Sequence, residues 1–113
     1  MGTRTRETDT ARRAQRLVTV QVVGRFDGST VPLVRSALRQ AVEDSDGDVL
    51  LDISGVDWID IPALALLADT QRRLRGRGRR LQLRGCEPRV RRALAVTRLN
   101  RVIAIERARR LAA

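Results

Sequence analysis

The chain has 113 residues, which suits one domain and is too short for two of ordinary size. It contains one cysteine, Cys86, and no histidine, which excludes an intrachain disulfide and argues against a zinc site. The formal net charge is +10 and every basic residue is arginine, so either a coding bias toward arginine or an anionic partner, such as nucleic acid, a membrane surface or an acidic protein face, explains the composition. The single thiol suits a cytoplasmic setting, and we expect neither a signal peptide nor a transmembrane segment.

The first part of the chain predicts a strand followed by a helix. Residues 1–16 are polar and form either a tail or an edge strand over about residues 4–10. Residues 17–23 are β-branched and partly alternating, which predicts a strand. Ser29 or Thr30 is suited to cap the helix that follows. Apolar residues recur at helical spacing along that helix to about residue 44: Val31, Val34, Leu38, Ala41 and Val42.

The middle of the chain repeats this order. Residues 49–53 are almost entirely apolar, which is typical of a central strand covered on both faces. A loop over residues 54–60 leads to a helix that begins at Ile61 or Pro62 and ends near residue 75. The first half of this helix is apolar nearly all round, so we expect it to be largely buried.

The last third predicts a further strand over residues 80–84, a helix starting at Pro88, a strand over residues 102–105 and a short helix over residues 106–113. Strands and helices therefore alternate along the whole chain. This order predicts an α/β domain over residues 17–113, with a mostly parallel central sheet of about four to five strands and about four helices.

Few residues in the chain are suited to catalysis. Histidine is absent, and no nucleophile elbow, phosphate-binding loop or dinucleotide fingerprint occurs. Cys86 lies in a predicted turn beside Arg84 and Arg89, which would lower its thiol pKa, but it has no histidine partner. The sequence therefore indicates that the protein is not an enzyme, and no cofactor is expected.

Two charged groupings admit a structural and a functional interpretation. Asp57 and Asp60 could bind a metal, but Asp60 is better placed to cap the following helix, so no metal site is predicted. The second grouping is the arginine cluster between residues 72 and 80, interpreted here as a solvated helix end. Nucleic acid is not expected as a partner, because stacking aromatic residues are missing beside these arginines.

Three stretches of the chain together resemble a known family. They are GRFDGSTVPLVRSAL, VLLDISGVDWIDIPALALL and RGRRLQLRGCEPRVRRALAVTRLNRVIAIE. They resemble the STAS domain, named for sulfate transporters and anti-sigma-factor antagonists, over about residues 17–106. The resemblance implies a single STAS-like domain. The length of this chain is most similar to that of the free-standing antagonists. In that type, a serine or threonine after the motif aspartate is phosphorylated by a kinase-type anti-sigma factor, which the unphosphorylated form binds.

The chain departs from the family pattern at the phosphorylation site. Asp60 matches the motif aspartate, but Pro62 occupies the place of the phosphoacceptor, and proline has no hydroxyl. The usual switch is therefore expected to be absent. By position, the resemblance implies these partner-binding residues: Asp27, Ser29, Asp60, Ile61, Pro62, Ala63 and Leu64.

The resemblance leaves more than one partner open. The first hypothesis is a regulatory module that binds an anti-sigma factor or a related kinase-like regulator. The alternative is a STAS accessory subunit of a lipid-transporting ABC system. A third interpretation is a nucleotide or lipid-headgroup binder that uses the basic surface, and an edge strand with an apolar patch leaves a homodimer open.

Overall fold

The structure is a computed structural model that describes residues 17–106. Its four strands form one parallel sheet in the order β1-β2-β3-β4: β1 (Val18–Gln21), β2 (Val49–Asp52), β3 (Leu81–Arg84) and β4 (Ala104–Ile105). The connections contain α2 (Val31–Asp44), α3 (Ile61–Arg75), α4 (Pro88–Val96) and the 3-10 helix η1 (Leu99–Arg101). The predicted α/β class and parallel sheet are confirmed. The predicted edge strand over residues 4–10 and nearly all of the predicted terminal helix lie outside the described residues.

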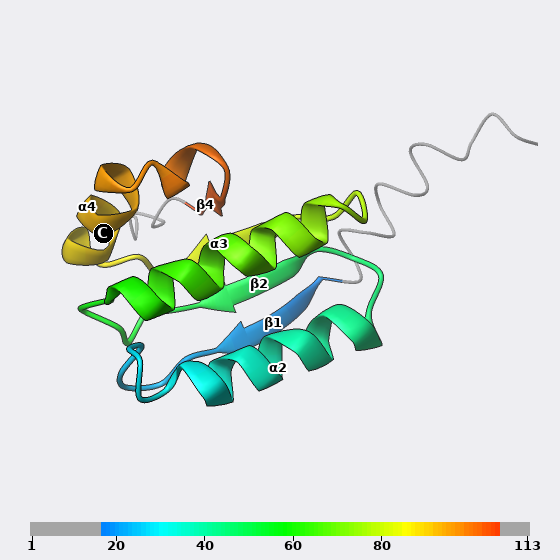
Figure 1. The fold of residues 1–113 in the computed structure, drawn as a ribbon, viewed down its shortest axis with the longest axis horizontal. Helices are drawn as coiled ribbons and strands as arrows, with labels where there is room; N and C mark the ends of the chain where they lie inside the picture. The colour runs from blue at the N-terminus through cyan, green and yellow to red at the C-terminus, as the bar shows by residue number, and fades with distance from the viewer. Residues whose placement is uncertain (1–16, 107–113) are drawn as a thin grey trace, which may run out of the picture.

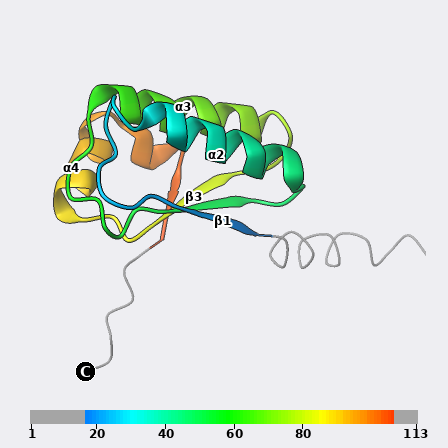
Figure 2. The ribbon, with the colours of Figure 1, turned by 90° about the horizontal axis from the view of Figure 1, so that it is seen from below.

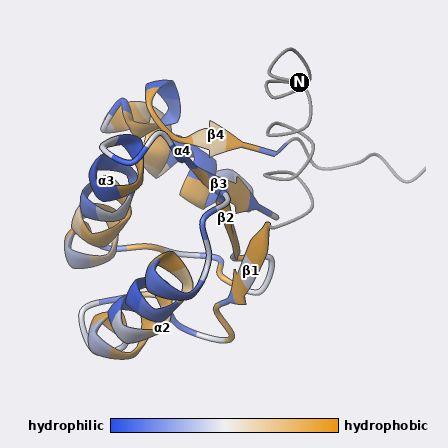
Figure 3. Ribbon diagram, turned by 90° about the vertical axis from the view of Figure 1, so that its right-hand side faces the viewer, coloured by the Kyte–Doolittle hydropathy of each residue, from blue (hydrophilic) through white to orange (hydrophobic). Residues whose placement is uncertain are grey.

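Helices α2 and α3 lie side by side on one face of the sheet (Figures 1 and 2). Figure 3 shows both helices turning hydrophobic residues toward the sheet and hydrophilic residues away from it. Helix α4 packs on η1, which leads into β4. None of the helices in the described part of the chain is long and apolar enough to cross a membrane.

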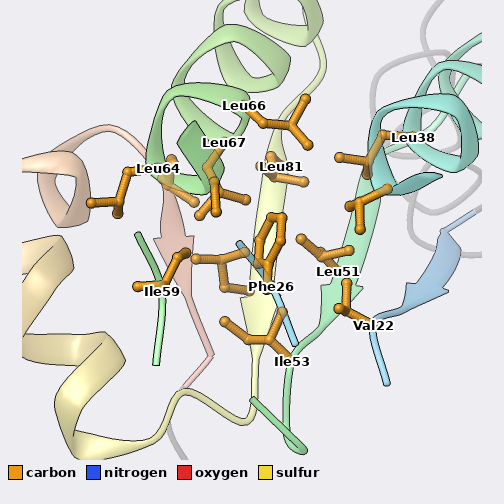
Figure 4. Packing of buried hydrophobic residues seen from close by; sticks show 14 of the residues in the cluster. Val22, Phe26, Leu38, Leu51, Ile53, Ile59, Leu64, Leu66, Leu67 and Leu81 are labelled. Atoms are coloured by element: carbon orange, nitrogen blue, oxygen red, sulfur yellow. The ribbon is translucent and has the colours of Figure 1, made fainter. Parts of the chain in front are cut away.

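The core between the sheet and the two helices follows from the apolar spacing of the sequence. The predicted apolar positions of α2 are all buried, and α3 buries most of its first half, as expected. Phe26 lies in the centre of this core, surrounded by aliphatic side chains from β2, β3 and α3 (Figure 4). It is 0% exposed, so the loop after β1 is anchored by its own aromatic side chain.

The last strand is shorter than the predicted range of 102–105. The main-chain N–H groups of Val102 and Ile103 both donate to the carbonyl of Leu99, at 3.1 and 2.9 Å. These bonds belong to the turn that closes η1, so the ladder with β3 begins only at Ala104. Ile103 is nevertheless buried and completes the core beside β3.

A glycine brings the turn after β3 against the loop after β2. Gly85 has a φ of +76°, and a Cβ placed there would lie 2.4 Å from Ser54 Oγ and 2.7 Å from Ser54 Cα. Only glycine combines that backbone conformation with so close an approach. The connections that follow β2 and β3 therefore meet at the carboxyl end of the sheet.

One arginine departs from the expected solvated helix end. Arg79 is 7% exposed, and its guanidinium donates to the carbonyls of Gly47 at 2.6 Å and Val42 at 2.8 Å, and to Ser45 Oγ at 3.1 Å. These acceptors lie at the end of α2 and in the turn that follows. Buried carbonyls need donors, and a guanidinium supplies several from one side chain. Arg79 is therefore a structural tie between α2 and the start of β3.

Candidate partner-binding surface

The loops that follow β1 and β2 are joined at the carboxyl end of the sheet. The main-chain N–H of Gly28 donates to Asp60 Oδ2 at 2.8 Å, across 32 residues of sequence. Phe26 and Ile59 form an isolated parallel bridge between the same two loops, and Figure 4 shows their side chains together in the core. The structure thus brings the predicted site residues near Asp27 next to those near Asp60.

Asp60 fixes the start of α3 as well as the loop contact. Its Oδ1 accepts a hydrogen bond from the main-chain N–H of Ala63 at 3.0 Å, and its carbonyl accepts one from Leu64 N–H at 2.9 Å. The predicted helix cap is therefore confirmed. One carboxylate serves two segments, because each oxygen binds a different main-chain donor.

Asp27 organises the start of α2 in a different way. Its carbonyl accepts from the N–H groups of Thr30 and Val31, at 3.0 and 2.9 Å, and its carboxylate accepts from Ser29. These bonds from Ser29, the side-chain one above all, hold the pKa of the Asp27 carboxyl below its ordinary value.

The prediction that the side chain of Ser29 or Thr30 caps α2 is wrong. Thr30 occupies the position before the helix, but its side chain does not cap it. The Thr30 hydroxyl instead bonds the carbonyl of Arg25 at 3.0 Å and accepts from Asp27 N–H at 3.1 Å. The backbone of Thr30 is already in the helical region, so its side chain closes the preceding turn.

The helix start divides the predicted contact residues into exposed and buried ones. Ile61 is 79% exposed and Pro62 is also on the surface. Ala63 is 0% and Leu64 8% exposed, because both side chains pack into the core under the helix. Of the predicted contact residues at this helix start, Ile61 and Pro62 are thus exposed, whereas Ala63 and Leu64 support them from inside the core.

Three exposed apolar side chains near this end were not among the predicted site residues: Val23, Leu33 and Trp58. Leu33 was detectable, because it lies two residues after Val31 and so falls off the buried stripe of α2. Trp58 is 55% exposed in the loop before α3, where an aromatic residue directly after Asp57 offered a weaker signal. Val23 carried none, since the strand pattern continues through it.

A hollow of about 620 Å³ lies beside Trp58. Its lining includes side chains from the loops after β1 and β2 and from the turn after β3: Arg25, Asp27, Ser54, Asp57, Trp58 and Glu87. Three of these are carboxylates and one is an aromatic ring. The chemistry of the hollow suits a basic side chain, which a carboxylate and an indole face both attract.

Cys86 lies close by but is not set up for reaction. It is buried, and burial raises the pKa of its thiol to about 11. The lowering by neighbouring arginines that the sequence suggested is outweighed, and the arginine that acts on it is Arg91. Within residues 17–106, no group of three or more potential ligands could hold a metal ion.

The model of the family described as "Mlab, STAS domain" matches residues 10–106. Proteins of curated function include no match. Among solved structures, an anti-sigma factor antagonist from Mycobacterium paratuberculosis superimposes with a TM-score of 0.74 and 24% identity, over 83% of this chain and 80% of the other. A putative anti-sigma factor antagonist from Thermotoga maritima gives 0.69 and 18%, over 80% of each chain.

The antagonist SpoIIAA in its unphosphorylated form gives a TM-score of 0.68 and 17% identity, over 80% of each chain. These likenesses define the class: a small α/β domain with the fold of the anti-sigma factor antagonists. The family match spans most of the sequence, and the protein belongs to the STAS domain family.

Proposed function

We propose that the protein is a regulatory binding module without catalytic activity, which contacts a kinase-type anti-sigma factor through the carboxyl end of its sheet. The observation that carries this proposal is the exposed pair Ile61–Pro62. It projects from a helix start that Asp60 holds at two points, to Ala63 at 3.0 Å and to Gly28 at 2.8 Å. A large apolar side chain held 79% exposed on a rigid support is suited to binding another protein.

The surface around this pair supports the same function. Leu33 and Trp58 add apolar area at the same end of the sheet. The hollow beside Trp58 adds carboxylates that would select a partner with a basic side chain. An apolar anchor next to a charged rim is the usual organisation of a specific protein interface.

The proposed contact is not controlled by phosphorylation at the family position. SpoIIAA has been solved in a phosphorylated form as well as an unphosphorylated one. In this chain Pro62 stands at the corresponding place of the motif, and its ring offers no acceptor for phosphate. Proline is well tolerated in the first turn of a helix, where it forfeits no hydrogen bond. The contact would therefore be constitutive.

Binding of an anti-sigma factor from the same genome, measured by calorimetry, tests the proposal. Ile61→Asp should weaken binding about tenfold or more, because it places a charge in the apolar contact. The control is Val96→Asp, since Val96 is 78% exposed but lies on α4. Equal affinity of Ile61→Asp and Val96→Asp would exclude this surface. Leu64 is unsuitable for such a test, because a charge at that buried position would unfold the helix start.

Incubation with the same factor and ATP tests the missing switch. Mass spectrometry should find no phosphate on the wild-type domain, and Pro62→Ser provides the variant that regains a hydroxyl. Phosphate on Ser29 or Thr30 of the wild type would contradict a constitutive contact.

The second candidate is an accessory subunit of a lipid-transporting ABC system. The observation that favours it is the same unswitched apolar contact, because a permanent subunit needs no phosphorylation control. Binding to an ABC ATPase, with none to the anti-sigma factor, would favour this function over the first. In that case too, Ile61→Asp should disrupt the complex.

A further inference from the structure

A second hollow, of about 1060 Å³, lies away from the candidate partner-binding surface. It is bounded by the end of α3, the turn before β3, the outer part of α4, and η1 with β4. Residues that precede parallel strands lie at the amino end of a sheet, so the part of this hollow next to β3 and β4 is opposite the loops that carry Ile61. Figure 1 shows the α3–β3 connection and the β2–α3 loop at opposite ends of α3.

Four exposed arginines line this hollow: Arg75, Arg80, Arg91 and Arg101. None of the described residues that line it is acidic. By contrast, four arginines outside it form ion pairs at 2.9–3.4 Å: Arg72 and Arg73 with Asp69, Arg77 with Glu43, and Arg84 with Glu106. The four exposed arginines of the hollow take no part in these ion pairs. The carboxylate of Asp48, which is not among the described lining residues, accepts from the main-chain N–H of Arg80 at 3.0 Å.

The floor of the hollow is partly apolar. Val102 is 48% exposed and Ala104 is also on the surface, and both line it. No aromatic side chain is among the described lining residues, which disfavours nucleic acid because single-stranded bases bind by stacking. The concave shape disfavours a flat membrane.

We propose that this hollow, the basic groove, binds an acidic polypeptide segment of a partner protein, with interspersed apolar residues. Guanidinium groups bind carboxylates through paired, charge-assisted hydrogen bonds, and the apolar floor would take the side chains between them. The chain's own terminal segments do not complement the groove, because both carry more arginines than carboxylates. A second copy of the chain, at a net charge of +10, is repelled as a whole.

Fluorescence anisotropy with a labelled peptide of about 12 residues, alternating glutamate or aspartate with leucine or alanine, tests the proposal. The groove variant is Arg91→Gln with Arg101→Gln. The control is Arg35→Gln with Arg39→Gln, two exposed arginines of α2 that do not line the groove. Both variants lower the net charge equally. The groove variant should lose about tenfold or more in affinity, and the control no more than about twofold.

Competing ligands show which class of molecule the basic groove binds. Tighter binding of the peptide than of a single-stranded oligonucleotide of equal charge, or of anionic phospholipid vesicles, supports the proposal. A preference for either of those, or equal losses in the two variants, overturns it, as does failure of the peptide to bind. Ile61→Asp should bind the peptide normally, so the basic groove is tested independently of the proposed function.

Discussion

Replacing Asp60 by alanine should cost more stability than an exposed aspartate normally does. The change removes the hydrogen bond that caps α3 through Ala63 and the bond that ties Gly28 to the same carboxylate. The lost cap costs about 1 kcal/mol. The second bond has a charged acceptor but lies in contact with water, so it adds about 1 kcal/mol more. The expected total is roughly 2 kcal/mol, which lowers Tm by about 8–12 °C for a domain of this size.

Urea and thermal unfolding, followed by far-ultraviolet circular dichroism, measure this loss. Asp60→Asn is the informative intermediate, because its single amide oxygen can accept one of the two bonds and the charge at the helix start is gone. It should lose about half as much. The matched control is Asp57→Ala, three residues earlier in the same loop, which is exposed and should change stability by less than about 0.5 kcal/mol. Equal stability of Asp60→Ala and Asp57→Ala would refute the double role of the carboxylate.

Three further perturbations test other parts of the structure. Gly85→Ala should lower the free energy of unfolding by about 3 kcal/mol or more. Gly24→Ala should lower it by only about 1–2 kcal/mol, because Gly24 has a φ of +83° but no atom near its Cβ. Similar losses in the two variants would show that the close approach at Gly85 does not matter. Arg79→Ala should lower the free energy of unfolding, measured by urea titration, by about 3 kcal/mol, and Arg77→Ala by less than about 1 kcal/mol. Equal losses would contradict the structural role of the buried Arg79 guanidinium. Cys86 should make folding less favourable as pH rises from 9.0 to about 11, because the unfolded thiol loses its proton first. The chain has no lysine or tyrosine to titrate there, and Cys86→Ala should abolish the slope.

Local patterns predicted the elements of this fold because each depends on neighbours in sequence. The buried stripe of α2 follows from helical spacing, and the cap of α3 follows from an aspartate just before an apolar run. The expectation that the phosphoacceptor is missing rests only on Pro62 and its alignment with the family motif, and it stays a prediction.

The contacts between elements could not be predicted from local sequence patterns. The bond from Gly28 to Asp60 and the bond from Arg79 to Gly47 each span 32 residues. Nothing near Arg79 in the sequence distinguishes it from the solvated arginines around it. Its burial depends on carbonyls that become neighbours only when α2 and β3 pack together.

The conflict between the predicted contact role of Ala63 and Leu64 and their burial has a different cause. The motif placed them at the partner surface by position, while the helical pattern of the same residues indicated burial. In the structure both residues are buried, because the side of α3 that covers the sheet cannot also be exposed to a partner. The first exposed residues are then Ile61 and Pro62, before the helix has turned toward the core.

Salt distinguishes the two surfaces physically. The basic groove would bind through guanidinium–carboxylate pairs at an open surface, and such pairs are screened as the Debye length falls from about 10 Å at 0.1 M to about 3 Å at 1 M salt. The contact at Ile61 would rest mainly on removing apolar surface from water, which salt weakens little. Affinity for an acidic peptide should therefore fall steeply with salt, while affinity for the partner at Ile61, to which the carboxylates beside Trp58 contribute less than the apolar contact, should fall less. A partner that shows the steep dependence, and loses it in the Arg91/Arg101 variant, must be held by the groove.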